Sequence, residues 1–111
     1  MERGNFAANL PDASQGEKIE VLSTFPGRTV AVERIVSEGQ TTPLGQWYDQ
    51  AWAEWVMVTK GSATLVFENP AAEETLSENE WILIPAHRRH RVSFTAPGTV
   101  WIAIHGDTVS G

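Results

Sequence analysis

Two of the chain's three histidines, His87 and His90, lie directly after an apolar run that ends at Pro85. Arg88 and Arg89 separate them. Histidine changes charge near neutral pH more readily than other side chains, and it is a common metal ligand. The spacing therefore leaves three interpretations open: metal ligands, acid–base groups, or ordinary residues at the end of a strand.

The composition limits the kind of protein and partner. With 111 residues a single domain is expected, and the absence of cysteine rules out disulfides and thiolate sites. The net charge of −6 argues against nucleic acid as a partner, because polyanions are repelled. No apolar run approaches the roughly 20 residues that span a bilayer, and no signal-peptide pattern begins the chain. We therefore expect a cytoplasmic protein without membrane contacts.

Short stretches rich in β-branched and aromatic residues alternate with turn signals, which is typical of an all-β sandwich or barrel. The pattern predicts about seven strands and no amphipathic helix. These strands cover residues 18–25, 28–36, 54–60, 62–68, 81–85, 89–94 and 99–105. The polar segment 69–80 is expected to be a connection with room for a helical turn. The unbroken apolar run 81–85 is expected to be a strand buried on both faces.

Alternation along two strands places one carboxylate and one imidazole in the interior. Successive side chains of a strand point to opposite faces. Glu54 therefore shares a face with Val56, and His90 shares a face with Val92 and Phe94. A buried carboxylate is costly unless it has a partner or a cation. The pattern thus predicts a cavity, open at one end, with Glu54 and His90 in its wall.

The other polar residues of this region are less constrained by the pattern. His87 reaches the interior only if the segment after Pro85 makes a turn. Arg89 and Arg91 fall on the outward face, either as a solvated surface or as a site for a small anion. His105 ends the last strand and is expected to face solvent.

The first of two groups of residues resembles a sequence motif of the cupins. Glu54, the six residues WVMVTK and Gly61 match the second half of the first cupin motif. The two histidines that normally begin this motif are absent. Depending on the spacing, their places fall on Trp47 and Asp49 or on Tyr48 and Gln50.

The second group resembles the second cupin motif. Pro85 and His90 match it, whereas Asn79 and His87 stand where the motif has glycines. The stretches WYDQ, EWV and IPAHRRHRV are also similar to a group of small single-domain bacterial cupins. The resemblance spans roughly residues 28–106 and implies a double-stranded β-helix, the jelly-roll barrel of this superfamily.

The domain organisation follows from this resemblance. Residues 1–27 are expected to form an N-terminal arm and the first strand, residues 28–106 the cupin barrel, and residues 107–111 a tail. Unpaired sheet edges, the arm and five tryptophans favour a homodimer, because association covers exposed edges and large aromatic side chains.

In metal-binding cupins, the motif histidines and glutamate hold a divalent ion. Carried over residue by residue, the resemblance implies Glu54 and His90 as ligands. Asp49 stands at the place of one missing histidine, and His87 is a candidate to supply the missing imidazole. Two nitrogens and two oxygens suit zinc, iron, manganese or nickel, and the sequence does not choose among them.

Two functions remain open from the sequence. The first is a small cupin that binds a divalent metal and a small organic ligand. It would be a metal-dependent enzyme of dioxygenase, isomerase or lyase type, in which Glu54 or His90 moves protons. The alternative is a metal-free binding or sensing module in which Trp47, Tyr48 and Gln50 contact a small ligand, with the arginines favouring an anionic one. Whether the protein is an enzyme is left open.

Overall fold

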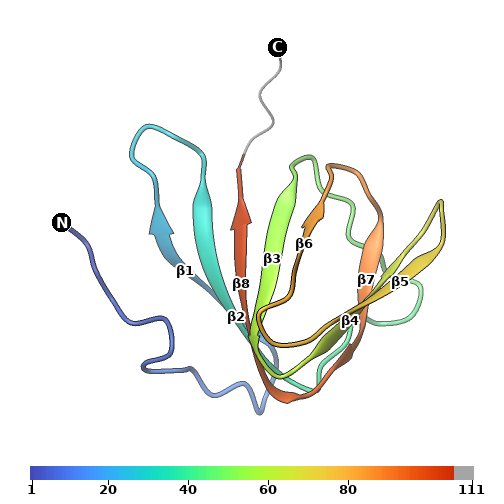
Figure 1. Ribbon diagram of the computed structural model, residues 1–111, viewed down its shortest axis with the longest axis horizontal. Helices are drawn as coiled ribbons and strands as arrows, with labels where there is room; N and C mark the ends of the chain where they lie inside the picture. Colours follow the sequence, from blue (N-terminus) through green and yellow to red (C-terminus); the bar gives the residue numbers. More distant parts are fainter. Residues whose placement is uncertain (107–111) are drawn as a thin grey trace.

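The computed structural model describes residues 1–106, which form eight β-strands and no helix (Figure 1). The strands are β1 (Lys18–Thr24), β2 (Ala31–Glu38), β3 (Glu54–Lys60), β4 (Ala63–Phe67), β5 (Ala72–Leu76), β6 (Trp81–Ile84), β7 (His90–Thr95) and β8 (Pro97–His105). They form two antiparallel sheets, with strand orders β1-β2-β8-β3-β6 and β5-β4-β7. The predicted tail at residues 107–111 lies outside the described residues.

The hydrophobic core lies between the two sheets. Val58 and Trp101 of the larger sheet belong to one buried cluster with Leu65 and Phe67 of the smaller sheet. The sheets meet at the lower end of the molecule and spread apart at the upper end (Figure 1). This arrangement confirms the all-β jelly-roll fold that the sequence predicts. Within residues 1–106 no helix is long and apolar enough to cross a membrane.

Strand β5 lies where the sequence predicts a polar connection, so that prediction is wrong. Only Leu76 of its five residues is buried. β5 is the outer strand of the smaller sheet and is held to β4 by main-chain pairing and by a hydrogen bond between the hydroxyls of Thr64 and Thr75 (2.9 Å). Backbone pairing at a sheet edge does not require apolar side chains, so the polar sequence gave no pattern from which this strand could be predicted.

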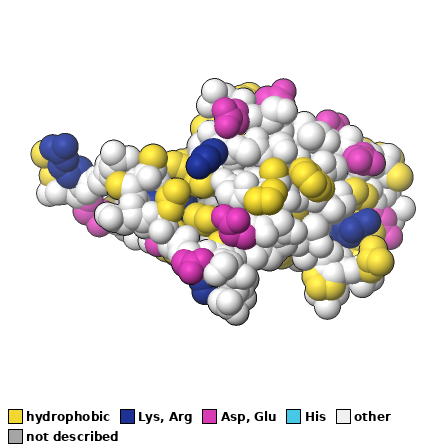
Figure 2. Space-filling view, turned by 90° about the horizontal axis from the view of Figure 1, so that it is seen from below, with side chains coloured by type: hydrophobic (Ala, Val, Ile, Leu, Met, Phe, Trp, Pro, Cys, Tyr) yellow, Lys and Arg dark blue, Asp and Glu magenta, His cyan; other side chains and the backbone are white. Residues whose placement is uncertain are grey.

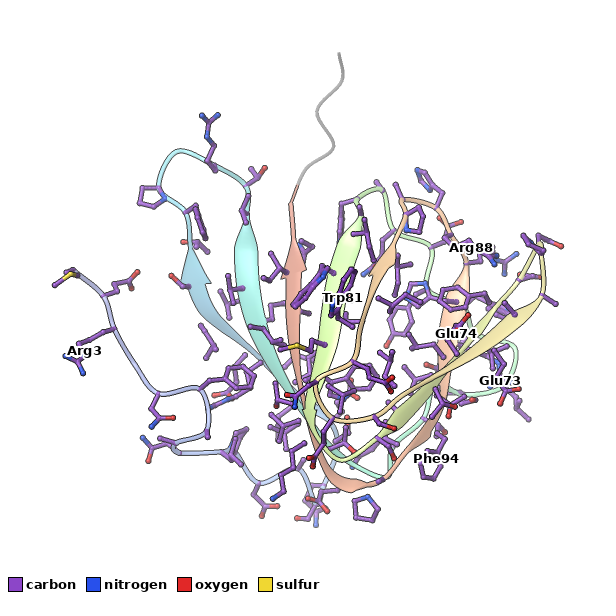
Figure 3. The ribbon with its side chains drawn as sticks, viewed as in Figure 1. Arg3, Glu73, Glu74, Trp81, Arg88 and Phe94 are labelled. Carbon is purple, nitrogen blue, oxygen red and sulfur yellow. The ribbon has the colours of Figure 1, made fainter. Side chains whose placement is uncertain are left out.

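Strand β6 is not buried on both faces, which corrects a second prediction. Trp81 and Leu83 remain 59% and 56% exposed, whereas Ile84 is buried. β6 is the outer strand of the larger sheet, beyond β3. Trp81 lies on the outside of the sheet, where its ring contacts that of Trp55 (Figure 3). The apolar run therefore serves an outer surface as well as the core.

A bulge in β7 reverses the face predicted for Phe94. His90 and Val92 point inward, as predicted, opposite Phe67 and Leu65. The register then shifts by one residue, so that Phe94 pairs with Thr64. An extra residue in one strand turns every later side chain to the other face. Phe94 consequently points outward and is half-exposed (Figure 3).

The N-terminal segment folds back on the outer face of the larger sheet. The guanidinium of Arg34, on β2, donates hydrogen bonds to the carbonyl oxygens of Phe6 (2.8 Å), Ala8 (2.8 Å) and Asn9 (3.2 Å). It also forms an ion pair with Glu20 (2.9 Å). A small second core beneath the arm consists of Ala13, Val36 and Val100, with Phe6 packed against them.

The view from below shows apolar side chains near the middle of this end of the molecule, with charged side chains scattered around them (Figure 2). No histidine is visible on this face. Strand β8 runs toward the opposite end, where it finishes at His105 (Figure 1). The candidate functional residues must therefore be sought at the end where the sheets spread apart.

The three positions at which the cupin motifs have glycine all adopt left-handed backbone conformations. The φ angles are 86° at Gly61, 69° at Asn79 and 59° at His87. Glycine adopts such angles without steric cost, asparagine tolerates them, and histidine does so less often. The turns of the fold are thus kept even where the motif residue has changed.

Gly61 has a second constraint besides its φ angle. A Cβ atom at this position would lie 2.5 Å from Oγ1 and 2.9 Å from Cα of Thr99. We expect Gly61→Ala to lower the free energy of unfolding by about 2–4 kcal/mol, since left-handed strain and overpacking add. Urea denaturation followed by circular dichroism measures this change.

The matched control is Gly27→Ala, because Gly27 has a φ of 71° and no atom within 4 Å of the added Cβ. That variant should lose only about 1–2 kcal/mol, the cost of the backbone conformation alone. Equal losses in the two variants would contradict the close packing of Gly61 against Thr99.

Candidate functional site

Three titratable side chains come together near one end of the larger sheet. Glu54 is the first residue of β3, and its cross-strand partner on β8 is His105. The imidazole Nε2 of His105 lies 3.1 Å from a carboxylate oxygen of Glu33, on β2. Directly opposed residues have neighbouring Cβ atoms, so the register itself brings Glu54 and His105 together.

His105 does not face solvent, which corrects the prediction made from its position at the strand end. Its side chain is 23% exposed and lines a cavity between the sheets. The ring of Trp52 stacks on it, with ring centres 5.5 Å apart. The strand residues before His105 are apolar on both faces, so the sequence held no sign of which face turns inward.

The cavity has a volume of about 350 Å³. Its aliphatic wall consists of Ile19, Ile35, Val56, Leu65, Ile84 and Val92. Its polar groups come from Glu17, Glu33, Gln50, Glu54, His90 and His105. The aromatic rings of Tyr48, Trp52 and Trp101 complete it. The sequence-based prediction that Glu54 and His90 share one interior is thereby confirmed.

Glu54 is largely removed from water within this wall. Burial raises the pKa of its carboxyl group above the ordinary value, and the nearby imidazoles of His105 and His90 oppose only part of that rise. Desolvation disfavours the charged form of an acid. Glu54 therefore keeps its proton to a higher pH than an exposed glutamate, which suits a group that exchanges protons with a ligand.

His90 presents one particular nitrogen for chemistry. It is 5% exposed, and its Nδ1 lies 2.8 Å from the carbonyl oxygen of Arg88. A carbonyl oxygen only accepts, so Nδ1 carries the proton and donates. In the neutral ring, Nε2 is then left as an acceptor. The rings of Tyr48 and Phe67, with centres 5.5 and 5.9 Å away, hold the imidazole in place.

The segment from Tyr48 to Trp52 closes one side of the cavity. Tyr48 pairs with His90 through two backbone hydrogen bonds, and the amide of His87 donates to the carbonyl oxygen of Gln50 (2.7 Å). Tyr48 and Gln50 line the cavity, in keeping with their predicted position. The indole N–H of Trp52 is buried and has no hydrogen-bond partner within residues 1–106.

Trp47 is not part of the cavity wall. It lies outside, where the guanidinium groups of Arg89 and Arg91 sit 5.7 and 5.8 Å from its ring centre. Arg88 donates to backbone carbonyl oxygens of Glu68 and Pro70. None of the three arginines lines the cavity, so they are not placed to hold an anionic ligand inside it.

Asp49 and His87 also lie outside, which corrects the four-residue arrangement expected from the motifs. The turn after Pro85 forms, but the left-handed backbone at His87 directs its side chain to the surface. There Nδ1 meets a carboxylate oxygen of Asp49 at 2.7 Å, and both side chains are well exposed. The structure therefore does not bring this pair to Glu54 and His90.

The donor set does not fit a resident metal ion. Within the described part of the chain, no three histidine or acidic side chains are grouped so that they could hold one. Zinc sites in proteins use three protein ligands when catalytic and four when structural. Glu54 and His90 remain as two ligands from the motif, with His105 already turned to Glu33.

Comparison with solved structures decides the family. The structure resembles that of a protein from Ralstonia eutropha JMP134 named a "putative mannose-6-phosphate isomerase", with a TM-score of 0.88. The two sequences are 38% identical, and the match covers 97% of this chain and 100% of that protein. The chain belongs to the cupin superfamily.

More distant cupins share the fold. An RmlC-like cupin from Desulfovibrio desulfuricans is 13% identical, with a TM-score of 0.76 and 96% of each chain covered. KdgF from Halomonas sp. is 15% identical, with a TM-score of 0.70 and 89% of this chain and 87% of that chain covered. No protein-family model and no curated protein matches the sequence.

His87 offers a test of its surface position. His87→Gly should change the free energy of unfolding by less than about 1 kcal/mol, because relief of left-handed strain offsets the lost ion pair and the added chain entropy. His90→Ala should cost about 2 kcal/mol or more, since it removes a buried ring and a hydrogen bond. Urea denaturation of both variants provides the comparison. A loss at His87 as large as that at His90 would show that His87 is not a surface residue.

Glu54 should make the stability of this cupin depend on pH. Because its pKa is raised on folding, its contribution to stability is fully present below the ordinary value of 4.5 and is lost as pH rises through the folded value. Glu54→Gln, which mimics the neutral acid, should therefore be more stable than the wild type near pH 8, and the difference should vanish near pH 4.

Thermal denaturation across this pH range measures the difference between the two proteins. Glu73→Gln is the matched control, because Glu73 is exposed on β5 and points away from the cavity (Figure 3). A Glu54→Gln variant that is less stable than the wild type near pH 8 would show that the carboxylate is stabilised in the fold.

Proposed function

We propose that this cupin binds a small organic molecule in its cavity and that Glu54 and His90 exchange protons with it, without a resident metal ion. One observation carries the proposal: a carboxyl group with a raised pKa and an imidazole with a free Nε2 line the same mostly apolar cavity. Titratable groups perturbed in this way are concentrated at functional sites.

The cavity suits a ligand of modest size. Its volume of about 350 Å³ is near the lower end of the range for small-molecule pockets. Aliphatic and aromatic side chains form most of the wall, and a few polar groups project from it. Such a lining binds an organic body by burial and fixes its orientation through hydrogen bonds.

The two groups could support proton-transfer isomerisation. Nε2 of His90 would take a proton from the carbon next to a carbonyl group, while the carboxyl group of Glu54 gives its proton to the carbonyl oxygen. When the carbon that loses the proton carries a hydroxyl, the product is an enediol. This hydroxyl then gives its proton to the Glu54 carboxylate, and the protonated His90 returns its proton to the former carbonyl carbon, which yields the isomeric carbonyl compound. The relative from Ralstonia eutropha is named as an isomerase, which supports this class of reaction over a purely structural role.

A metal-dependent reaction receives less support from the residues present. Asp49 and His87 pair with each other at the surface, and no group of three ligands forms within residues 1–106. A divalent ion would need ligands from water or substrate at most of its positions. The sequence-based expectation of zinc, iron, manganese or nickel stays a prediction.

Strand β1 supports the homodimer expected from the sequence. It is the outer strand beyond β2, and Ile19, Val21 and the following Phe25 are each more than half exposed. Exposed apolar edge strands tend to pair with another chain. The dimer also stays a prediction.

Filling the cavity should weaken ligand binding. Val92→Phe places a larger side chain in the wall, so the affinity for a bound probe should fall at least about tenfold. The probes are benzyl alcohol, benzylamine, benzoate, mannose and mannose 6-phosphate. NMR titration measures binding through the indole N–H signals of the tryptophans, two of which, Trp52 and Trp101, line the cavity.

Leu83→Phe is the matched control, because Leu83 is 56% exposed on the outside of the larger sheet. It should leave probe binding unchanged. The proposal fails if Val92→Phe binds as tightly as the wild type. It also fails if protein purified without tag or chelator carries close to one equivalent of a transition metal that is lost in His90→Ala.

A further inference from the structure

The charge of the cavity wall is strongly one-sided. Three acidic side chains, Glu17, Glu33 and Glu54, line it together with two imidazoles. No lysine or arginine of residues 1–106 does so. Arg34, the one arginine buried in the sheet, lies on the opposite face of β2 and is held by Glu20 and the arm.

From this lining we propose that the ligand carries a positively charged amine, bound among the carboxylates and aromatic rings, and that the cavity disfavours phosphate and carboxylate groups. The inference rests on the proposed function, since it assumes that the cavity binds a small organic molecule. It names the charge and chemical class of that molecule.

The acidic side chains come from three elements of the larger sheet, with β8 between β2 and β3. Glu17 directly precedes β1, Glu33 lies on β2 and Glu54 on β3. The hydroxyl of Ser37 donates to Glu17 (2.7 Å) and accepts from the indole N–H of Trp101 (3.3 Å), so the Glu17 carboxylate is fixed in place. A wall with preset acceptors binds a cation without reorganisation.

Only part of this negative charge is balanced inside the cavity. His105 pairs with Glu33, but no basic side chain approaches Glu17 or Glu54 closely enough for an ion pair in the described residues. The same acidic side chains affect Tyr48. Burial is the main cause that raises the pKa of its hydroxyl, and Glu17 and Glu54 raise this pKa further. Negative potential in a partly dry cavity attracts cations and repels anions.

Aromatic rings provide the second element of cation recognition. Tyr48 and Trp52 line the cavity, and the segment that carries them leads directly into Glu54 at the start of β3. An ammonium group near the face of tyrosine or tryptophan gains cation–π attraction, more so when it is desolvated. Carboxylates and rings together therefore favour an organic amine over a bare metal ion, for which no three-ligand group exists in residues 1–106.

The same lining argues against a sugar phosphate as the ligand, although a sugar phosphate appears in the name of the relative from Ralstonia eutropha. Phosphate is bound by arginine, lysine or helix N-termini, because these offer charge and donors. Residues 1–106 contain no helix, and no basic side chain lies in the cavity wall. A phosphate there would meet three acidic side chains.

Three probes of similar shape and different charge test the inference: benzylamine, benzyl alcohol and benzoate. Isothermal titration calorimetry at pH 7 and low salt measures each dissociation constant. Benzylamine should bind at least about tenfold more tightly than benzoate, with benzyl alcohol between them. Added salt should weaken benzylamine binding.

Carboxylate variants locate the effect. Glu17→Gln and Glu33→Gln should each weaken benzylamine binding by roughly three- to tenfold while changing benzyl alcohol binding little. Glu73→Gln, on the outer face of β5, removes the same charge outside the cavity and should have no effect (Figure 3). Circular dichroism confirms that each variant is folded.

The two proposals fail in different ways. Tighter binding of benzoate or mannose 6-phosphate than of benzylamine overturns the inference of a cationic ligand, while binding in the cavity still stands. Equal loss of benzylamine and benzyl alcohol binding in Glu17→Gln and Glu33→Gln has the same consequence. If none of the probes binds, both the inference and the proposed function are rejected.

Discussion

The site depends on the cross-strand register of the larger sheet. Side chains alternate between its faces, and the pairing of Glu54 with His105 on β8 puts both on the inner face. On the other side of β8, the pairing with β2 brings Glu33 within hydrogen-bonding distance of His105. If either pairing slipped by one residue, the side chains of the shifted strand that now line the cavity would point outward, and those that now point outward would enter the cavity. The buried residues of the same strands, such as Val58 and Trp101, make such a slip costly, so the core that stabilises the fold also fixes the chemistry.

Turn geometry decides which of the two neighbouring histidines enters the cavity. At His87 the chain adopts a φ of 59°, a conformation for which the cupin motif supplies glycine. The turn redirects the chain so that His90 begins β7 facing inward, while His87 itself is left at the surface beside Asp49. A histidine at this place therefore gives no inward ligand, although its distance along the sequence from His90 suggests a pair. The motif position at residue 87 therefore constrains the backbone conformation of the turn and does not supply a side chain to the cavity.

The sequence predicted those parts of the site that lie on strands with one apolar face. Glu54 and His90 stand in segments where alternation is clear, so their shared interior could be predicted. Glu33 and His105 could not be placed, because β2 and β8 carry apolar residues on both faces, one against the core and one against the arm or the surface. Phe94 was misplaced because a bulge is a property of the pairing between two strands, which the sequence of one strand does not display. The jelly-roll fold itself followed from strand spacing and the motif residues, whereas the edge strand β5 was hidden by its polar side chains.

Burying the acidic wall has a physical cost that the rest of the fold must offset. Isolated carboxylates in a partly dry cavity destabilise the folded chain unless they are protonated or meet a positive charge. Glu33 is satisfied by His105, and Glu17 by the hydroxyl of Ser37, but Glu54 is left with an elevated pKa and no fixed partner of opposite charge. A protein under selection for stability alone would replace such a residue by an apolar one of similar size. A ligand that brings a positive charge or a proton acceptor to Glu54 would offset this cost, which links the energetics of the acidic wall to the filling of the cavity.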